Sequence, residues 1–484
     1  MRSIGAIIRS APRLARSAAV IAAAAAFLSL PGGCGDAGGK GTAPDGRVVI
    51  SYWEKWTGFE KDAMQAIVDD YNTSQSRVRV ELLPVSDISQ KVMLASAGGN
   101  PPDVAGLYSD DVFPYARRGA LIPLDSLGAL ERVSKKDYLP VYWRQCEHFG
   151  MLWALPSTPT SIALHWNKKL FREAGLDPDR PPRTIAELDE MCDRLTVVEL
   201  WRNGEMARVR YSELSEDERR KKDFRIVRLG FSPLEPGWWS PYWGLWFGGR
   251  IWDPETKTLT PDSKGDIEAF EWIRSFPERY GVDNIRSFDS SFGNFASPRN
   301  PFLSGKVAME LQGVWMHNFI EKYAPNMEWG AAPFPTKDGK GTVTVAESDV
   351  LAIPRGAKHP REALDFILYV NRRKTMEKLC LLQRKFTPLR AVSPDFYARH
   401  PNPYIKMFRS LAESPGAYGT PPIPILNEYA DGLEAAAERV FFMIDTPRDA
   451  LEGVRKRFEK RLRQYYKRWA MVKDRRLEEW RRTR

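Results

Sequence analysis

Histidine and cysteine are scarce in this chain, which limits the chemistry that it can perform. Its 484 residues include five histidines and four cysteines. The histidines are scattered and lack the short spacing of zinc ligands. The patterns G-x-S-x-G, G-x-x-x-x-G-K-[ST] and H-E-x-x-H are also absent. We therefore expect no metal and no other cofactor, and the absences exclude the motif-bearing serine hydrolases, P-loop proteins and zinc proteases.

Three of the cysteines, Cys146, Cys192 and Cys380, lie far apart and form no C-x-x-C pair. Their spacing does not single out a disulfide, although an exported protein is able to hold one. Because a free cysteine behaves as a small apolar residue, we expect buried thiols.

The chain also lacks an apolar run long enough to cross a bilayer, which takes about 20 residues. The apolar run at 18–30 follows four arginines and ends at Pro31-Gly32-Gly33-Cys34. This order predicts an export signal at 1–34 and a protein that works in the periplasm or at the cell surface. A buried helix or a short anchor is the alternative. The Gly-rich residues 35–46 are expected to form a flexible linker.

Cys34 is the predicted lipidation site, because a cysteine after small residues at the end of a signal resembles a bacterial lipobox. The usual leucine stands three positions before the cysteine, whereas Leu30 stands four before Cys34 and Pro31 takes its place. Ordinary cleavage near Gly33 is therefore the alternative. Lipidation would anchor the protein to the membrane.

Excess positive charge is confined to one end of the chain. Residues 455–484 hold fourteen Lys and Arg against four Asp and Glu, which equals the net charge of +10 of the whole chain. Four signal arginines leave the body slightly acidic, so no basic folded face indicates nucleic-acid binding. Apolar residues spaced through 458–477 predict a basic helical tail at 459–484, either capping a lobe or facing a membrane or partner. Beyond residue 470 we expect a protruding end.

Strands and helices alternate after the linker. Residues 48–53, 78–82 and 103–107 read as strands, and 60–71, 88–97 and 185–195 as amphipathic helices. This alternation predicts an α/β architecture with a mainly parallel sheet. Asn203-Gly204, between two β-rich runs, predicts an exposed hairpin within 197–228. About 450 residues are too many for one core, so we expect two domains.

Several local patterns resemble the bacterial extracellular solute-binding proteins of ABC transporters, in the sugar-binding group that includes maltose-binding protein. The resemblance covers about 48–458. Its patterns are YWEKWTG at 52–58, GGNPPDV at 98–104, YARRGALIPLD at 115–125, LP at 155–156 with WNKKLFREAGL at 166–176, PRTIAEL at 182–188, and FLSGKVAM at 302–309 with Gly313 and Trp315. The long hairpin and the charged tail depart from the family pattern.

The resemblance implies a two-lobe, periplasmic-binding-protein-like α/β fold of type II, with discontinuous lobes and a hinge. It implies a first lobe at 47–162 plus 333–395 and a second lobe at 163–332 plus 396–458. The chain would cross between them near 161–164, near 329–334 and after about 391. It also implies a carbohydrate ligand held between the lobes and ABC permease subunits as partners.

Candidate ligand-binding residues come from the sequence and from the resemblance. A sugar offers flat ring faces and hydroxyls, which aromatic planes and carboxylates bind. Trp238, Trp239 and Trp243 fall in a Gly/Pro-broken aromatic segment, whereas nearby Trp246 and Trp252 read more as strand or core. Trp53 and Glu54 end a strand, where α/β sheets hold ligands. The remaining candidates are Trp315 and Asp110, which match family ligand contacts, and Asp111, Thr158, Gln312 and Glu347. Asp111 has helix capping as its alternative role.

Two other functions remain open at this stage. An exported carbohydrate-active hydrolase would need two carboxylates roughly 5–10 Å apart, for example from Glu54, Asp110 and Glu347. A binding protein for a non-sugar solute, such as a polyol or a glycerol phosphate, is the other. We favour a binding protein over an enzyme because a hinged fold accounts for the same residues.

Overall fold

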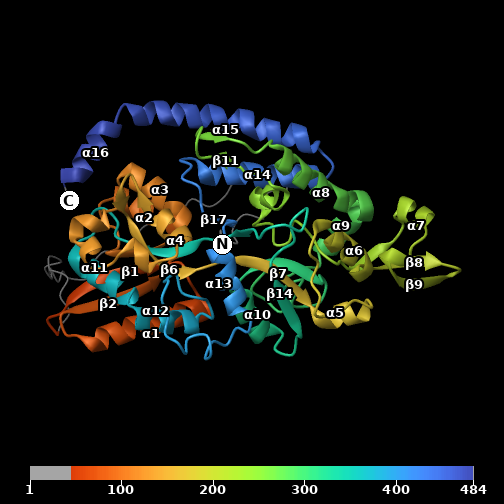
Figure 1. Ribbon diagram of the computed structural model, residues 1–484, viewed down its shortest axis with the longest axis horizontal. Coiled ribbons are helices and arrows are strands. Elements are labelled where there is room, and N and C mark those ends of the chain that lie inside the picture. Colours follow the sequence, from red (N-terminus) through yellow and green to blue (C-terminus); the bar gives the residue numbers. More distant parts are fainter. Residues whose placement is uncertain (1–44, 483–484) are drawn as a thin grey trace, which may run out of the picture.

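The computed structural model describes residues 45–482. The predicted signal, Cys34 and all but the last two residues of the predicted linker lie outside the described residues. Figure 1 shows two lobes side by side, with one long helix running along an edge of both. Within 45–482, no helix has the length and apolar character that a bilayer crossing requires.

A five-stranded sheet forms the centre of the first lobe, in the order β2-β1-β3-β16-β6. Its strands are β1 (Val48–Glu54), β2 (Val78–Pro84), β3 (Val104–Tyr108), β6 (Ala154–Pro159) and β16 (Ser348–Ala352). The helices of this lobe are α1 (Gly58–Ser74), α2 (Ile88–Ala97), α3 (Ser109–Arg118), α4 (Pro140–Cys146), α11 (Pro360–Val370) and α12 (Arg373–Leu382). Alternation along β1 buries Ile50, Tyr52 and Glu54 on one face.

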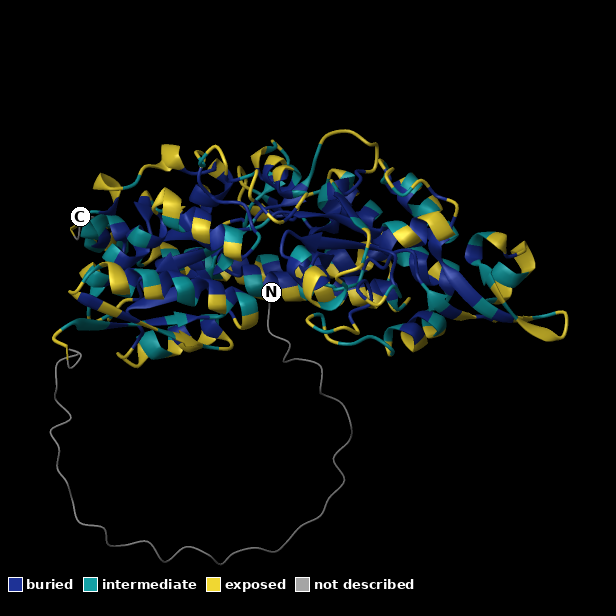
Figure 2. Ribbon diagram, turned by 90° about the horizontal axis from the view of Figure 1, so that it is seen from below, coloured by how far each residue is buried: buried dark blue, intermediate teal, exposed yellow. Residues whose placement is uncertain are grey.

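The second lobe contains a three-stranded sheet in the order β13-β7-β14. Its strands are β7 (Ile162–Asn167), β13 (Met309–Gly313) and β14 (Trp329–Ala332). Its helices include α5 (Lys168–Glu173), α6 (Ile185–Leu195), α8 (Lys264–Tyr280), α9 (Val282–Asp289), α10 (Met316–Tyr323) and α14 (Leu426–Phe441). Figure 2 shows the strands of both lobes as buried interiors under mixed outer surfaces.

The expectation of a mainly parallel sheet is wrong. In the two central sheets, β1 pairs in parallel with β2 and β3, whereas β16 is antiparallel to β3 and β6, and β7 is antiparallel to β13 and β14. The reason is that the chain passes from one lobe to the other between successive strands. β13, α10 and β14 form a βαβ unit whose parallel strands are separated by β7, which enters from the first lobe in the opposite direction.

The chain crosses between the lobes three times before its C-terminal helices. The first crossing joins β6 to β7 at Thr160–Ser161. The second lies between β15 (Thr344–Val345) and β16, later than the expected 329–334, because β14 pairs in the second lobe and Phe334 lies in its core. Residues 333–343, which were expected in the first lobe, therefore come before the chain crosses into it. The third precedes α13 (Ile405–Glu413), which packs with Tyr142, Val314 and Phe386 at the junction.

The predicted hairpin is confirmed as β8 (Val197–Arg202) and β9 (Glu205–Arg210). Asn203 and Gly204 at its turn have φ of 54° and 87°, the region that Asn and Gly tolerate best. β10 (Arg225–Arg228) completes a small sheet with β8 and β9. α7 (Glu216–Lys221) lies between β9 and β10 in the sequence. This arm projects from the end of the second lobe (Figures 1 and 2).

Two helices end the chain, α15 (Pro447–Ala470) and α16 (Lys473–Arg482). α15 starts on the second lobe, where Leu451 and Phe458 are buried, and its lysines and arginines face outward. The expectation of a protruding end beyond residue 470 is wrong, because Trp480 of α16 is 1% exposed in the core of the first lobe. The three cysteines are buried free thiols, as expected.

Candidate binding site between the lobes

The polar side of the site lies at one edge of the first-lobe sheet. β1 ends at Glu54 and β3 ends at Tyr108, and because β16 runs antiparallel to β3, its Asp349 pairs with Tyr108. Residues from three strands therefore meet where two parallel strands end. This is the edge at which open α/β sheets bind ligands.

A buried ion network occupies this edge. The Lys55 ammonium lies 3.2 Å from Glu54 Oε1 and 3.0 Å from Asp349 Oδ1. The Lys385 ammonium lies 2.9 Å from Glu60 Oε1 and 3.6 Å from Asp349 Oδ2. Charges removed from water are costly unless they are paired and hydrogen-bonded, and here each ammonium touches two carboxylates. Burial alone would raise the pKa of Asp349, but the two lysines hold it below its usual range.

Neighbouring groups fix the geometry of the network. Tyr52 donates a hydrogen bond to Glu54, and Thr158 donates one of 2.8 Å to Asp349. Burial raises the pKa of Glu54. A Cβ at Gly106 would stand 1.9 Å from the Glu54 carboxylate, so only glycine fits beside it. The Trp56 ring lies 4.8 Å from the Lys55 ammonium, which adds a cation–π contact.

Aromatic side chains form a second group, the second-lobe wall, in which Trp239 and Trp315 are buried in the core of that lobe. The Trp315 ring centre lies 6.3 Å from that of Trp239 and 6.5 Å from that of Trp238. Trp238 also meets Phe295 at 4.8 Å and is only partly buried. The Trp315 ring lies over Gly313, where a Cβ would come within 2.2 Å of it. Close to this wall the two lobes touch, because Phe59 of α1 contacts Phe319 of α10, with ring centres 5.7 Å apart.

Buried polar groups accompany this wall. Glu310 and Gln312 lie on the same face of β13, by the alternation of a strand. Within the described residues, both Glu310 carboxylate oxygens and Gln312 Nε2 lack a hydrogen-bond partner. Burial raises the pKa of Glu310 well above its usual range, and burial together with Asp289 raises that of Glu235 to about 8. Unpaired buried polar atoms are costly, which makes these groups candidates for ligand contacts.

The structure thus places six of the predicted residues in two groups, one on each lobe. Glu54 and Thr158 belong to the ion network, and Trp238, Trp239, Trp315 and Gln312 to the second-lobe wall. Sequence reasoning missed Lys55, Glu60, Asp349 and Lys385 in the ion network, and Glu310 beside the wall. The alternation of apolar and polar residues at 309–312, inside a recognised pattern, was the available signal for Glu310.

Other predicted residues have different positions. Trp53 points to the opposite face of β1 from Glu54. Asp110 lies in the first turn of α3 and is partly buried. Glu347 precedes β16 and accepts a hydrogen bond of 3.4 Å from Thr420, which also donates to Gln145. Glu347 therefore lies at the junction of the lobes.

Two predicted residues have structural roles outside the proposed site. Trp243 is buried in the core of the second lobe, where its ring meets Trp246 at 5.4 Å and Trp272 at 5.2 Å. Asp111 is buried and accepts hydrogen bonds from the Ser89 hydroxyl and the Tyr108 amide, so it caps α3. Burial raises its pKa to about 7. We leave both residues out of the proposed site.

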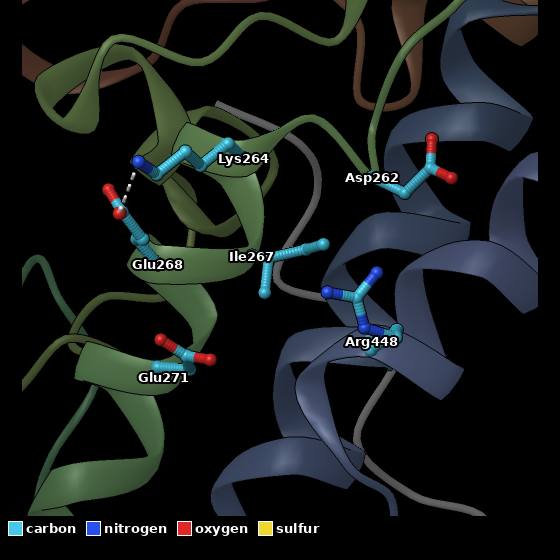
Figure 3. Close-up of a pocket in the computed structure, with 6 residues that line it drawn as sticks. All are labelled: Asp262, Lys264, Ile267, Glu268, Glu271 and Arg448. Atoms are coloured by element: carbon cyan, nitrogen blue, oxygen red, sulfur yellow. Dashed lines mark ion pairs between the residues drawn. The ribbon is translucent and has the colours of Figure 1, made fainter.

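A hollow of about 360 Å³ lies outside this region, between α8 and the start of α15 (Figure 3). Its lining residues are Asp262, Lys264, Ile267, Glu268, Glu271 and Arg448. The lining is mostly charged and lacks aromatic rings, so it offers no stacking plane. None of the predicted site residues belongs to it.

The two groups of residues lie on different lobes, next to the contact between α1 and α10. Over 45–482, no cluster of three His, Cys, Asp or Glu residues is placed to hold a metal ion. Aromatic planes on one lobe and charge-assisted hydrogen-bonding groups on the other suit a ligand with apolar faces and many hydroxyls.

Comparison with known proteins shows the family and several relatives. Residues 59–377 match the family described as bacterial extracellular solute-binding protein. A maltotriose-binding protein of Pyrococcus abyssi is 22% identical over 297 residues, which cover 61% of this chain and about half (55%) of that protein. The structure of CpMnBP1 with mannobiose bound superposes with a TM-score of 0.71 and 27% identity, over 84% of this chain and 98% of that one.

A shorter similarity is to a protein named for a different ligand. The sn-glycerol-3-phosphate-binding periplasmic protein of Brucella abortus is 24% identical over 157 residues, which cover 30% of this chain and 35% of that protein. The family match spans both lobes, whereas this one covers less than a third of the chain.

Proposed function

Because the chain belongs to the bacterial extracellular solute-binding protein family, we propose that it captures a neutral carbohydrate between its lobes and delivers it to an ABC importer. The proposal rests on two groups of residues, the cluster of Trp238, Trp239 and Trp315 on the second lobe and the buried hydrogen-bonding network on the first, between which we place the ligand. The similarity to CpMnBP1, described with mannobiose and with mannotriose bound, supports this ligand class. We propose a binding role without hydrolysis, as in the family.

The charges favour a neutral ligand over a glycerol phosphate. A phosphate needs cations or free amide donors, and both buried lysines of the site are already paired with carboxylates. Three carboxylates face two ammonium groups in the network, so its net charge is negative. An anion would therefore enter a region of unfavourable potential.

Titration calorimetry of the full chain tests the proposal with mannotriose and sn-glycerol-3-phosphate as probes. We expect saturable binding of mannotriose and none of the phosphate. The variant Trp238→Ala should bind mannotriose more weakly by about 1 kcal/mol, because one stacking plane is lost. Trp201→Ala, which removes a 69% exposed tryptophan from the hairpin, is the matched control. Binding of the phosphate alone, or equal affinity in Trp238→Ala and the parent, would contradict the proposal.

We further propose that the protein is exported and held at the membrane through a lipidated Cys34. The family supports an extracytoplasmic location. The Gly-rich stretch after Cys34 would then act as the tether.

A further inference from the structure

The C-terminal helices are attached to both lobes. The first half of α15 is built into the second lobe, where Leu451, Val454, Phe458 and Leu462 are buried in the core. The Phe458 ring meets Tyr429 of α14 at 5.7 Å, and Arg455 pairs with Asp262 at 2.8 Å. This half of the helix is therefore a fixed part of the second lobe.

The end of α15 is attached to the first lobe. The Arg117 guanidinium, at the end of α3, lies 3.5 Å from the Tyr465 ring centre and 4.5 Å from that of Trp469. It also donates a hydrogen bond of 3.3 Å to the Tyr465 carbonyl. Arg117 is 5% exposed, so this cation–π contact is largely shielded from water.

α16 continues the attachment to the first lobe. Trp480 enters its core, with ring centres 5.0 Å from Trp153 and 5.5 Å from Phe149. Glu479 pairs with Arg355 at 3.1 Å. The chain thus returns to the first lobe a last time, after the crossings that the family fold requires.

A continuous helix joins the two attachments. Leu462 is the last fully buried side chain of α15 in the second-lobe core, and Tyr465 and Tyr466 still pack against that core. Because Arg117 of the first lobe contacts Tyr465 and Trp469, α15 passes from one lobe to the other without a break. The other crossings are extended segments that can rotate at a few bonds, whereas an α-helix bends only gently. A rotation of one lobe against the other would therefore have to detach one end of this helix pair.

Both attachments are made while the lobes touch. Phe59 meets Phe319 across the junction, and Arg384 after α12 donates a hydrogen bond of 2.9 Å to Asn318 of α10. We propose that α15 and α16 form a strap that holds the lobes together, and that α16 must leave the first lobe before the cleft opens.

α16 is the end that detaches. It has ten residues, and isolated helices of that length are marginal in water. The first half of α15, by contrast, buries four apolar side chains in the second-lobe core. The effect of the strap on ligand exchange rests on the proposed function, whereas its effect on lobe separation does not. By stabilising the closed state, the strap slows release of a bound ligand and raises affinity.

Two full-chain variants test the strap, with Trp201→Ala as the control. Trp480→Ala removes the anchor of α16, and Arg117→Gln leaves Trp480 in place while removing the cation–π contact. Small-angle scattering without ligand should show a larger radius of gyration in both variants than in the parent and control. Stopped-flow fluorescence with mannotriose should show release faster by about tenfold, with a smaller rise in the association rate.

The outcomes separate the strap from the ligand class. An unchanged radius in Arg117→Gln, with a native circular dichroism spectrum, would overturn the strap even if Trp480→Ala failed to fold. Larger radii in the variants, together with no mannotriose binding by any of the proteins, would support the strap and contradict the proposed ligand. Larger radii with an unchanged rate of mannotriose release would contradict the proposal that the strap controls ligand exchange.

Discussion

Replacing Asp349 by Asn would remove the charge that both buried lysines share. In the parent, Asp349 lies 3.0 Å from the Lys55 ammonium and 3.6 Å from that of Lys385, and it accepts a hydrogen bond from Thr158. In the variant, an amide that carries donors would face one of the lysines. Glu54 and Glu60 would remain as the carboxylate partners of the two buried cations.

The expected loss is several kcal/mol. At an effective dielectric constant of about 20, each attraction across these distances is roughly 5 kcal/mol before desolvation is subtracted. Removing one partner of a buried ion pair costs about 3–5 kcal/mol, and Asn keeps part of the hydrogen bonding, so we expect about 3 kcal/mol. For a lobe of this size that corresponds to a melting temperature lower by roughly 6–12 °C.

Thermal melting at several pH values measures this effect. Because the pKa of Asp349 lies below its usual value, its stabilisation is complete above about pH 5 and is lost as the pH falls below about 4. The difference between parent and variant should therefore shrink in acid. Asp70→Asn, which removes the 42% exposed partner of Lys378, should melt like the parent. A parent-like melt of Asp349→Asn at pH 7 would refute the reasoning.

Two further predictions concern other parts of the chain. Because burial raises the pKa of Glu235 to about 8, the folded state keeps a proton that the unfolded chain releases near pH 4–5, so stability should fall as the pH rises from 5 to 8. Glu235→Gln should make the melting temperature depend less on pH in this range. Glu255→Gln, at an exposed position, should leave the dependence unchanged. The same pH dependence in Glu235→Gln and the parent would contradict a buried proton at Glu235. Cys34→Ser should move the protein from the detergent phase to the aqueous phase on partitioning, whereas Cys380→Ser should not; an aqueous parent protein would rule out the lipid anchor.

Local patterns predicted much of the fold and only part of the site. The helices at 88–97 and 185–195 begin and end where periodicity and capping residues place them, because those signals are local. Strand direction and the second crossing depend on which distant segments pair, which periodicity does not encode. Aromatic density at 238–252 did not separate Trp238, at the cleft, from Trp243, in the core, because the segment has no regular period that assigns its faces.

The docking of Trp480 also fixes the order in which the protein can finish folding. The first lobe contains Ile50 from the beginning of the described chain and Trp480 from its end. During synthesis the N-terminal segments emerge first, so the pocket formed by Trp153 and Phe149 stays open until the last residues arrive. Such distant contacts slow folding, because a long loop must close before they form. The lobe that appears first is therefore completed last, and a nascent chain exposes this aromatic surface until α16 has been made.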